Sequence, residues 1–393
     1  MAGNLRARLA RIREATDRGS RPAASRPAPG ESPDASPVGA SEFPDDWETI
    51  APGLRFRESV RRDGAMASPR ADISLPVFSS RLAGTVEAGG LLFFDLETTG
   101  LSGGAGTVAF LAAFGSLRTD GSLSVRQYFM DDYPYERALV AAMGDEFAKA
   151  SAVVSYNGSS FDLPLYAVRR AMAGLGPAPS QPHADALHAA RRLWRRSMPD
   201  CSLGCLEAGI LGVRRVGDIP GSEVPAVWFD FLRSGRTERL GRVFSHNEQD
   251  IASLASLAFA MHDAARGGRE LPSADPIGLA ELRSRVDEDL AERTLAAALE
   301  AGDRRATRPL MRLYRRTGRT DGIAPLVPLL PDDPAGLFSK SVYAERRLRD
   351  TSEALRLAEL AAELGRGGVR DRALKRAARL RARQATAVRQ FPS

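Results

Sequence analysis

The chain has 393 residues, which is enough for a catalytic domain and a second, smaller domain. It carries 55 Lys and Arg against 49 Asp and Glu, a net charge of +6 that fits a polyanionic partner and, equally, a solvated basic surface. Because no apolar stretch is long enough to span a membrane and the N-terminus lacks the apolar block of a secretion signal, we expect a cytoplasmic protein with no membrane contact.

The first 88 residues carry no recognisable chemistry. Residues 1–45 begin with Arg, Ala and Leu and continue with Pro, Ala, Ser and Gly, a composition that buries too little apolar surface to fold. We therefore predict a disordered basic tail there. Residues 46–88 contain scattered apolar side chains such as Trp47 and Phe56, and we predict an accessory segment that packs outside the following domain.

Residues 89–265 alternate between strand-like and helix-like patterns. We predict strands at 91–97, 107–117, 123–130, 152–158 and near 183–187. The first three should form an antiparallel meander. A helix predicted over 135–150 then makes the fourth strand parallel to the first, because such crossovers join parallel strands. The pattern indicates an α/β fold with a mixed five-stranded sheet flanked by helices.

Residues 266–393 consist almost entirely of helix-forming residues interrupted by turn sequences. Segments 310–319 and 341–350 look like two degenerate copies of a helix-pair repeat, at a spacing near that of tetratricopeptide units. We predict an all-α, tetratricopeptide-like region that could bind a protein partner. Residues 370–383 form a basic helix for which a solvated surface is favoured over phosphate contact.

Paired acids follow the first predicted strand of this α/β domain. The apolar run 91–94 leads directly into Asp95 and Glu97, and side chains two residues apart on a strand share a face. Two carboxylates held this close repel each other, and a divalent cation with oxygen ligands keeps both ionised. The stretch therefore predicts part of a Mg²⁺ or Mn²⁺ site.

Two further acids stand out by their context. Asp162 follows the fourth strand at the start of a predicted helix, and Asp250 lies near the buried face of the helix predicted over about 242–265. Taken singly, Asp162 is a common helix-terminal acid and Asp250 an ordinary solvated one. A two-metal site that hydrolyses phosphodiesters nevertheless needs more than one pair of carboxylates.

Three segments in order, DLETTG, YNGSSFDLPLY and HNEQDIASL, resemble the sequence motifs of the DEDD exonucleases, which have the ribonuclease H-like fold. The resemblance covers about 89–265 and is closest to the YprB-type ribonuclease H-like domain. It implies that Asp95, Glu97, Asp162 and Asp250 bind two Mg²⁺ or Mn²⁺ ions. It also implies a 3′-to-5′ exonuclease that hydrolyses phosphodiester bonds of single-stranded DNA or RNA.

The general base of that family lies on the last helix, either as a His five residues before the final Asp or as a Tyr four residues before it. This chain has His246 at the four-residue position and Ser245 at the five-residue position. On a helix, a residue four before Asp250 lies on the same face, and an imidazole is well suited to remove a proton at neutral pH. We expect His246 to be the base.

Neighbouring residues suggest contacts with nucleic acid. Thr98 could donate to a phosphate or a 3′ hydroxyl, Asn157 could bond a nucleotide, and Phe161 could stack on a base. Turn chemistry for Thr98 and core packing for Phe161 are equally compatible with the sequence, and Asp185 is a possible extra acid. The alternatives to a nuclease are a non-catalytic nucleic-acid-binding protein and a scaffold that acts through its helical repeats.

Overall fold

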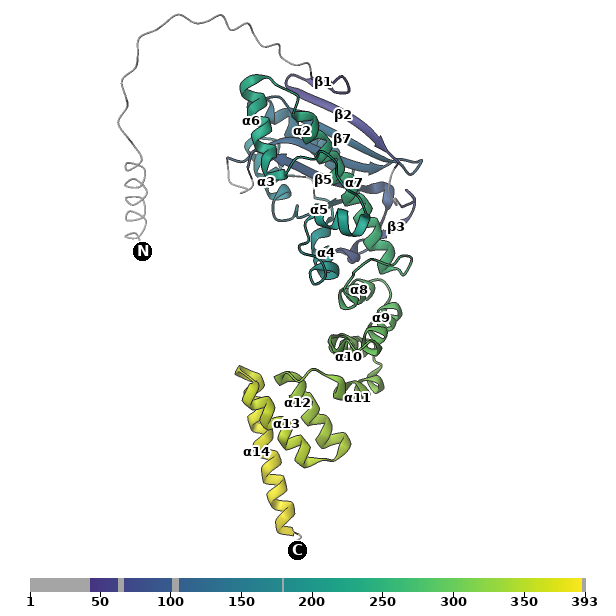
Figure 1. Cartoon of the computed structure of the whole chain (residues 1–393), viewed down its shortest axis with the longest axis vertical. Helices are drawn as coiled ribbons and strands as arrows, with labels where there is room; N and C mark the ends of the chain where they lie inside the picture. The colour runs from purple at the N-terminus through teal and green to yellow at the C-terminus, as the bar shows by residue number, and fades with distance from the viewer. Residues whose placement is uncertain (1–42, 63–66, 101–105, 179, 391–393) are drawn as a thin grey trace, which may run out of the picture. The chain divides into compact units, whose positions relative to one another are not determined.

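A computed structural model describes residues 43–62, 67–100, 106–178 and 180–390, with side chains up to residue 385 (Figure 1). The predicted basic tail, residues 1–45, lies outside these ranges except for its last three residues.

A seven-stranded mixed sheet forms the centre of the α/β domain. Its strand order is β1-β2-β7-β6-β5-β8-β9, and only the β5–β8 and β8–β9 pairs are parallel. The five predicted strands are all present in the predicted directions. The strands are β1 (Glu48–Ala51), β2 (Leu54–Arg61), β5 (Leu91–Thr98), β6 (Ala109–Leu117), β7 (Leu123–Met130), β8 (Ala152–Ser155) and β9 (His183–Asp185).

The predicted number of strands was too low, because residues 46–88 contribute two strands to the sheet. β2 pairs with β7 along its whole length, from Leu54 opposite Met130 to Arg61 opposite Leu123. The sequence of β2, LRFRESVR, begins with alternating apolar and charged residues, as expected for a strand with one solvated face, and β1 covers its outer edge. Residues 67–90 add a separate two-stranded sheet, β3 (Asp72–Ser74) with β4 (Thr85–Glu87).

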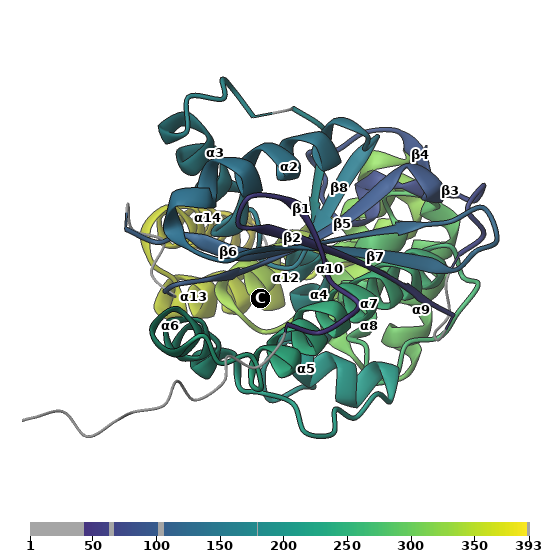
Figure 2. The same ribbon diagram turned by 90° about the horizontal axis from the view of Figure 1, so that it is seen from above.

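Helices cover both faces of β5, which explains its uninterrupted apolar run. Phe93 contacts Phe259 with ring centroids 5.5 Å apart on one face, and Phe94 contacts Phe147 at 4.9 Å on the other. Figure 2 shows α2 and α3 on the opposite side of the sheet from α7. The helices of this part are α2 (Glu136–Ala148), α3 (Asp162–Met172), α4 (Ala186–Trp194), α5 (Leu203–Leu206), α6 (Val224–Ser234) and α7 (Leu240–Ala265).

A glycine in β6 determines how closely α7 approaches the sheet. Gly115 lies opposite Phe93, and a Cβ atom at this position would be only 2.4 Å from Cγ2 of Ile251 on α7. No side chain fits in that space without moving the helix or the isoleucine. The depth of α7 on the sheet therefore depends on this contact.

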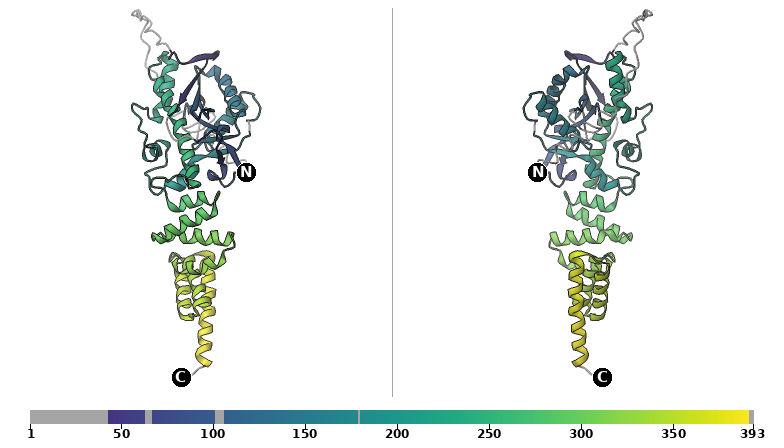
Figure 3. Two further views of the ribbon diagram at one scale, coloured as in Figure 1. Left: turned by 90° about the vertical axis from the view of Figure 1, so that its right-hand side faces the viewer. Right: turned by 90° about the vertical axis from the view of Figure 1, so that its left-hand side faces the viewer.

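The C-terminal part is helical, as predicted. No strand occurs among the described residues from 266 to 390 (Figure 3). One apolar cluster joins α8 to α11 and a second joins α12 to α14. The tetratricopeptide-like character stays a prediction. These helices are α8 (Pro276–Arg283), α9 (Glu288–Glu300), α10 (Thr307–Arg316), α11 (Ile323–Leu326), α12 (Pro334–Tyr343), α13 (Thr351–Leu364) and α14 (Gly367–Gln390).

The substitution Gly115→Ala should lower the free energy of unfolding by about 1–3 kcal/mol, because the added methyl group overpacks the contact with Ile251. Urea unfolding followed by circular dichroism measures this change. Gly241→Ala on α7 is the matched control, since nothing lies within 4 Å of its Cβ position, and it should be neutral or stabilising. An equal loss in both variants would contradict the packing argument.

Candidate active site

The paired acids of β5 face α7. Alternate side chains of a strand share a face, so Asp95 and Glu97 lie on the same side as Phe93, which contacts α7. Both carboxyl groups are largely buried, and the Glu97 side chain is 12% exposed. The strand therefore delivers two acids into the layer between the sheet and α7.

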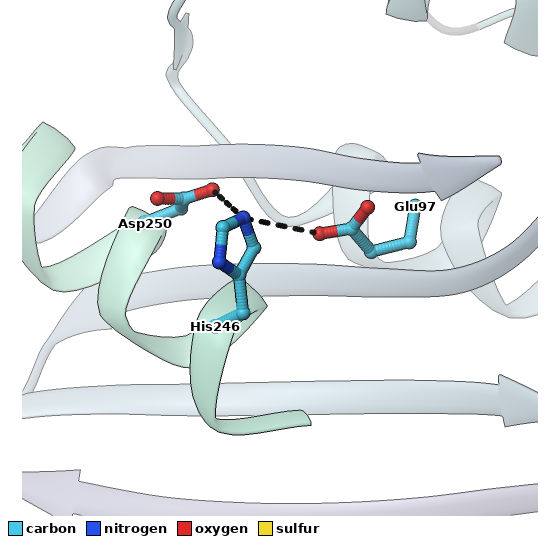
Figure 4. A group of neighbouring side chains, drawn as sticks. All are labelled: Glu97, His246 and Asp250. Atoms are coloured by element: carbon cyan, nitrogen blue, oxygen red, sulfur yellow. Dashed lines mark ion pairs between the residues drawn. The ribbon is translucent and has the colours of Figure 1, made fainter. Parts of the chain in front are cut away.

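Two residues one turn apart on α7 meet Glu97 in this layer. Nε2 of His246 lies 4.0 Å from Oε1 of Glu97 and 3.4 Å from Oδ2 of Asp250 (Figure 4). The three residues offer ligand atoms that all lie within 4.8 Å of one another. Two carboxylates and an imidazole at this spacing can hold a divalent cation.

Asp95 is joined to α7 by a buried amide, although it is not in that three-residue group. Nδ2 of Asn247 donates to Oδ2 of Asp95 at 2.8 Å, and Oδ1 of Asn247 accepts from Nε2 of Gln127 at 3.0 Å. Gln127 on β7 also donates to the Phe244 carbonyl at 2.9 Å. These bonds fix Asp95, the sheet and α7 relative to one another. No local pattern singles out Asn247 beyond its place beside His246.

Asp162 is the first residue of α3 and is 7% exposed. It also lies outside the group of three, but its charge contributes to the raised pKa values of Asp95 and Glu97, so it is within electrostatic range of both. Asp162 and Asp250 therefore both act on the strand acids Asp95 and Glu97, while the tightest contacts join Glu97, Asp250 and His246.

Asp185 organises the turn that leads to Asp162. Its carboxylate accepts from the backbone N–H groups of Asn157 at 2.8 Å and Ser159 at 3.1 Å, and from the Ser159 hydroxyl at 2.5 Å. It also caps α4 by accepting from the Leu187 N–H at 3.1 Å. With its oxygens committed to these four donors, Asp185 holds the turn in place.

The acids titrate far from their usual range. Burial raises the pKa of Asp95 and of Glu97 well above the ordinary value, and the charge of Asp250 raises both further. Burial raises the pKa of Asp162 to about 7, and Asp185 adds to the rise. Burial also raises the pKa of Asp250, which His246 and Arg215 lower only in part. A bound cation would favour the ionised forms of all four.

An arginine of the 212–220 loop bonds to this cluster of acids. Arg215 donates from Nη2 to Oδ1 of Asp250 at 2.5 Å and from Nε to Oε2 of the buried Glu207 at 2.6 Å. Burial lowers the pKa of Arg215, but the charges and hydrogen bonds of Asp250 and Glu207 raise it more, so the guanidinium stays protonated. Arg215 therefore holds Asp250 from the side of the loop.

The same loop also fixes the orientation of His246. Oδ1 of Asp218 lies 2.8 Å from Nδ1 of His246. Burial raises the pKa of Asp218, but the hydrogen bond from His246 and the charges of His246 and Arg215 lower it to a net value below the usual one, so Asp218 is an ionised acceptor. Nη1 of Arg215, which can only donate, lies farther from the same nitrogen, at 3.2 Å. We assign the proton to Nδ1, toward the closer and ionised Asp218, so Nε2 is the nitrogen that faces Glu97 and Asp250.

The side of the site formed by α7 and the 212–220 loop lines an open cavity of about 650 Å³. Its walls include Glu207, Arg215, Asp218, His246 and Asp250, together with Leu203 and Gly204 of α5. The cavity is of the size that holds small ligands in other proteins.

The three residues predicted to contact nucleic acid occupy different environments. The Thr98 hydroxyl is buried and donates to the Gly100 carbonyl at 2.9 Å, which is turn chemistry. Asn157 is exposed and has a φ of 67°, a left-handed conformation that Asn tolerates better than most residues. Phe161 is half-buried and packs against the core cluster of α2 and α3. Their contact with nucleic acid stays a prediction.

Comparison with known proteins places this chain in a family. A sequence model described as RNase_H superfamily matches residues 92–262, which include β5, the turn before α3 and most of α7. The chain therefore belongs to the RNase H superfamily, and within it to the same family as a Bacillus subtilis (strain 168) protein. That relative is the uncharacterized protein YprB, which is 31% identical over 283 residues, 68% of either chain.

A solved structure with a weaker likeness is the family B DNA polymerase from the hyperthermophilic archaeon Pyrobaculum calidifontis, at 16% identity and a TM-score of 0.37. The match covers 62% of this chain and spans 33% of the polymerase. Membership of the superfamily itself indicates a nuclease-type or nucleic-acid-processing role. Among the helices described, none combines the length and the apolar character needed to cross a membrane.

Asp162→Asn should change how stability depends on pH in the presence of a chelator. The folded-state pKa near 7 exceeds the ordinary value of 3.8, so folded Asp162 retains a proton that the unfolded chain has released. The contribution of Asp162 to the free energy of unfolding is fully present below its pKa in the unfolded chain. It is lost as the pH rises through its pKa in the folded chain. Between about pH 5 and about pH 8 the variant should gain roughly 2 kcal/mol relative to the wild type.

Urea unfolding at both pH values measures the difference. Asp120→Asn, in the exposed turn between β6 and β7, is the control and should show no such gain. A stability difference between Asp162→Asn and the wild type that does not change with pH would show that Asp162 titrates normally.

Proposed function

We propose that this protein is a divalent-metal-dependent nuclease, a 3′-to-5′ exonuclease that hydrolyses phosphodiester bonds of single-stranded DNA or RNA. In this proposal Asp95, Glu97, Asp162 and Asp250 bind two Mg²⁺ or Mn²⁺ ions, and His246 is the general base. The observation that carries the proposal is the convergence of the β5 acids with Asp250 and His246 of α7, more than 140 residues later in the chain.

The donor set fits hard divalent cations. The four proposed ligands are all carboxylates, and Mg²⁺ and Mn²⁺ prefer oxygen ligands over sulfur. The raised pKa values of the four acids give the second argument, because burying so many carboxylates side by side is costly without a cation. When bound, two such ions activate water and stabilise the leaving oxygen of a phosphodiester.

The residues of the chain supply orientation and proton transfer. With the Nδ1 proton donated to Asp218, Nε2 of His246 is the nitrogen that can accept a proton from an attacking water. Its position between Glu97 and Asp250 places that acceptor among the proposed ligands. Asn247 keeps Asp95 in register with α7, which aligns the strand acids with those of the helix.

One observation favours a second function, in which the domain binds nucleic acid without cleaving it. Arg215 occupies Oδ1 of Asp250 with a charge-assisted hydrogen bond, and an arginine competes with a cation for the same carboxylate. Oligonucleotide binding without hydrolysis in the presence of Mg²⁺, Mn²⁺ or other divalent ions would favour this alternative.

With Mn²⁺ or Mg²⁺, the purified protein should shorten a single-stranded oligonucleotide labelled at its 5′ end into a ladder. Asp95→Asn should reduce the rate by a factor of 100 or more, roughly the loss seen when a key charged group is removed from an active site. Asp145→Asn, an exposed acid on α2, is the matched control and should retain activity. Equal activity in Asp95→Asn and the wild type would refute the proposed metal site.

Asp218→Asn should lower kcat by roughly 10- to 100-fold, because the neutral amide can donate as well as accept and so no longer fixes the His246 tautomer. Oligonucleotide affinity should change little. If Asp218 acts through His246, the double variant Asp218→Asn/His246→Ala should be no slower than His246→Ala alone. Losses that multiply in the double variant would show that Asp218 acts independently of His246.

A further inference from the structure

A second cavity, of about 670 Å³, lies outside the active site between α4 and α8. Arginine side chains dominate its lining. The lining residues with charged side chains are Arg191, Arg192, Arg195, Arg196, Arg305, Asp275 and Glu281.

The cavity has rigid walls, because α8 is seated directly on the C-terminal end of α4. A Cβ atom at Gly278 would lie 1.9 Å from the Arg192 carbonyl oxygen, so the two helices touch through their backbones. The Asp275 N–H donates to the Leu193 carbonyl at 2.7 Å, and the Trp194 indole donates to the Pro272 carbonyl at 3.0 Å. The arginines of α4 are thus held opposite the start of the C-terminal helices.

The charges in the cavity do not balance. Five guanidinium groups face two carboxylates, which leaves three positive charges in excess. The excess is unchanged when the outside partners are counted, because Asp303 bonds Arg305 and Arg285 bonds Glu281. Glu281 bonds Arg192 at 2.7 Å. Asp275 is shared between Arg305 at 3.0 Å and Arg196 at 3.5 Å.

Arg191 and Arg195 carry the excess charge. Both are exposed, they lie one helical turn apart, and within the described part of the chain neither makes an ion pair. Like charges at this spacing repel each other, and the dipole of α4 offsets only a part of that cost. An anion that spans both guanidinium groups would relieve the repulsion.

The cavity and the active site are neighbours, separated by the 200–204 segment. Arg195 and Arg196, which line the arginine cavity, come just before this segment in the chain. On the other side of the segment, Leu203 and Gly204 line the active-site cavity. A nucleic-acid strand that extends from the active site over this segment would bring its phosphate groups to the arginines.

We propose that the arginine cavity between α4 and α8 binds the phosphodiester backbone of a nucleic-acid strand whose end lies in the active site. The inference rests on the proposed function for the strand end. Guanidinium groups bind phosphate oxygens through paired hydrogen bonds and read no base sequence, so the cavity selects strands by length. The substrate class is therefore a strand that extends several nucleotides beyond the cleaved bond.

The test compares double variants in a chelator, so that binding is measured without hydrolysis. Arg191→Ala/Arg195→Ala should weaken binding of a fluorescent single-stranded oligonucleotide at least about tenfold at low salt. The slope of log affinity against log salt should fall by about 1.4, which corresponds to two lost phosphate contacts on a single strand. Arg191→Lys/Arg195→Lys keeps the charge and should retain most of the slope.

Arg366→Ala/Arg370→Ala is the matched control, because these two exposed arginines have the same spacing, with Arg366 just before α14 and Arg370 in its first turn. It should bind like the wild type. An equal loss in the control, or unchanged binding in Arg191→Ala/Arg195→Ala, overturns the inference. Unchanged oligonucleotide binding with lost binding of polyglutamate would assign the cavity to an acidic protein segment and also overturns it.

A small substrate separates this inference from the proposed function. Hydrolysis of bis-p-nitrophenyl phosphate with Mn²⁺ involves no extended backbone. It should therefore depend on Asp95 and be unaffected in Arg191→Ala/Arg195→Ala. Absence of hydrolysis in the wild type with any divalent ion counts against the nuclease, whereas the binding comparison in chelator still tests the cavity.

Discussion

Electrostatic repulsion among buried carboxyl groups is the constraint on which the rest of this structure depends. Burial raises the pKa values of all four acids, and the charges of Asp162 and Asp250 raise those of Asp95 and Glu97 further, so the ionised cluster opposes folding. Individual hydrogen bonds from neighbouring side chains offset part of this cost. The Asn247 amide bonds Asp95, and the Arg215 guanidinium bonds Asp250. Clustered acids with shifted pKa values are typical of functional sites, and the proposed cations would offset their repulsion.

Two kinds of support position the cluster. The first is the packing of α7 on the sheet, which Gly115 allows. The hydrogen bonds of Asn247 to Gln127 and Asp95 then fix the register of α7 against β5. The 212–220 loop provides the second through Arg215 and Asp218. The strand and helix fix where the acids lie, and the loop orients the groups that act on them.

The fold was largely predictable because periodicity is a local signal, and the parts that were missed are those in which it is weak or the partner is distant. Asp95 and Glu97 follow an apolar run that is typical of a buried strand, whereas the charged residues of β2 concealed a strand near the solvated end of the sheet. Asn247 bonds Asp95, which lies 152 positions earlier in the sequence, and no local sequence pattern predicts such a pair. Asp185 was a possible extra acid until its bonds to the turn at Asn157 defined its place.

The position of the imidazole follows from helix geometry and the loop together. Ser245, at the five-residue spacing, is exposed and donates its hydroxyl back to the Gly241 carbonyl at 2.9 Å, so this position points away from the acids. His246, four residues before Asp250, lies on the face that looks toward Glu97. An imidazole there needs an acceptor for Nδ1, which α7 does not provide. Asp218 provides it from the loop, and Nε2 then faces the acids.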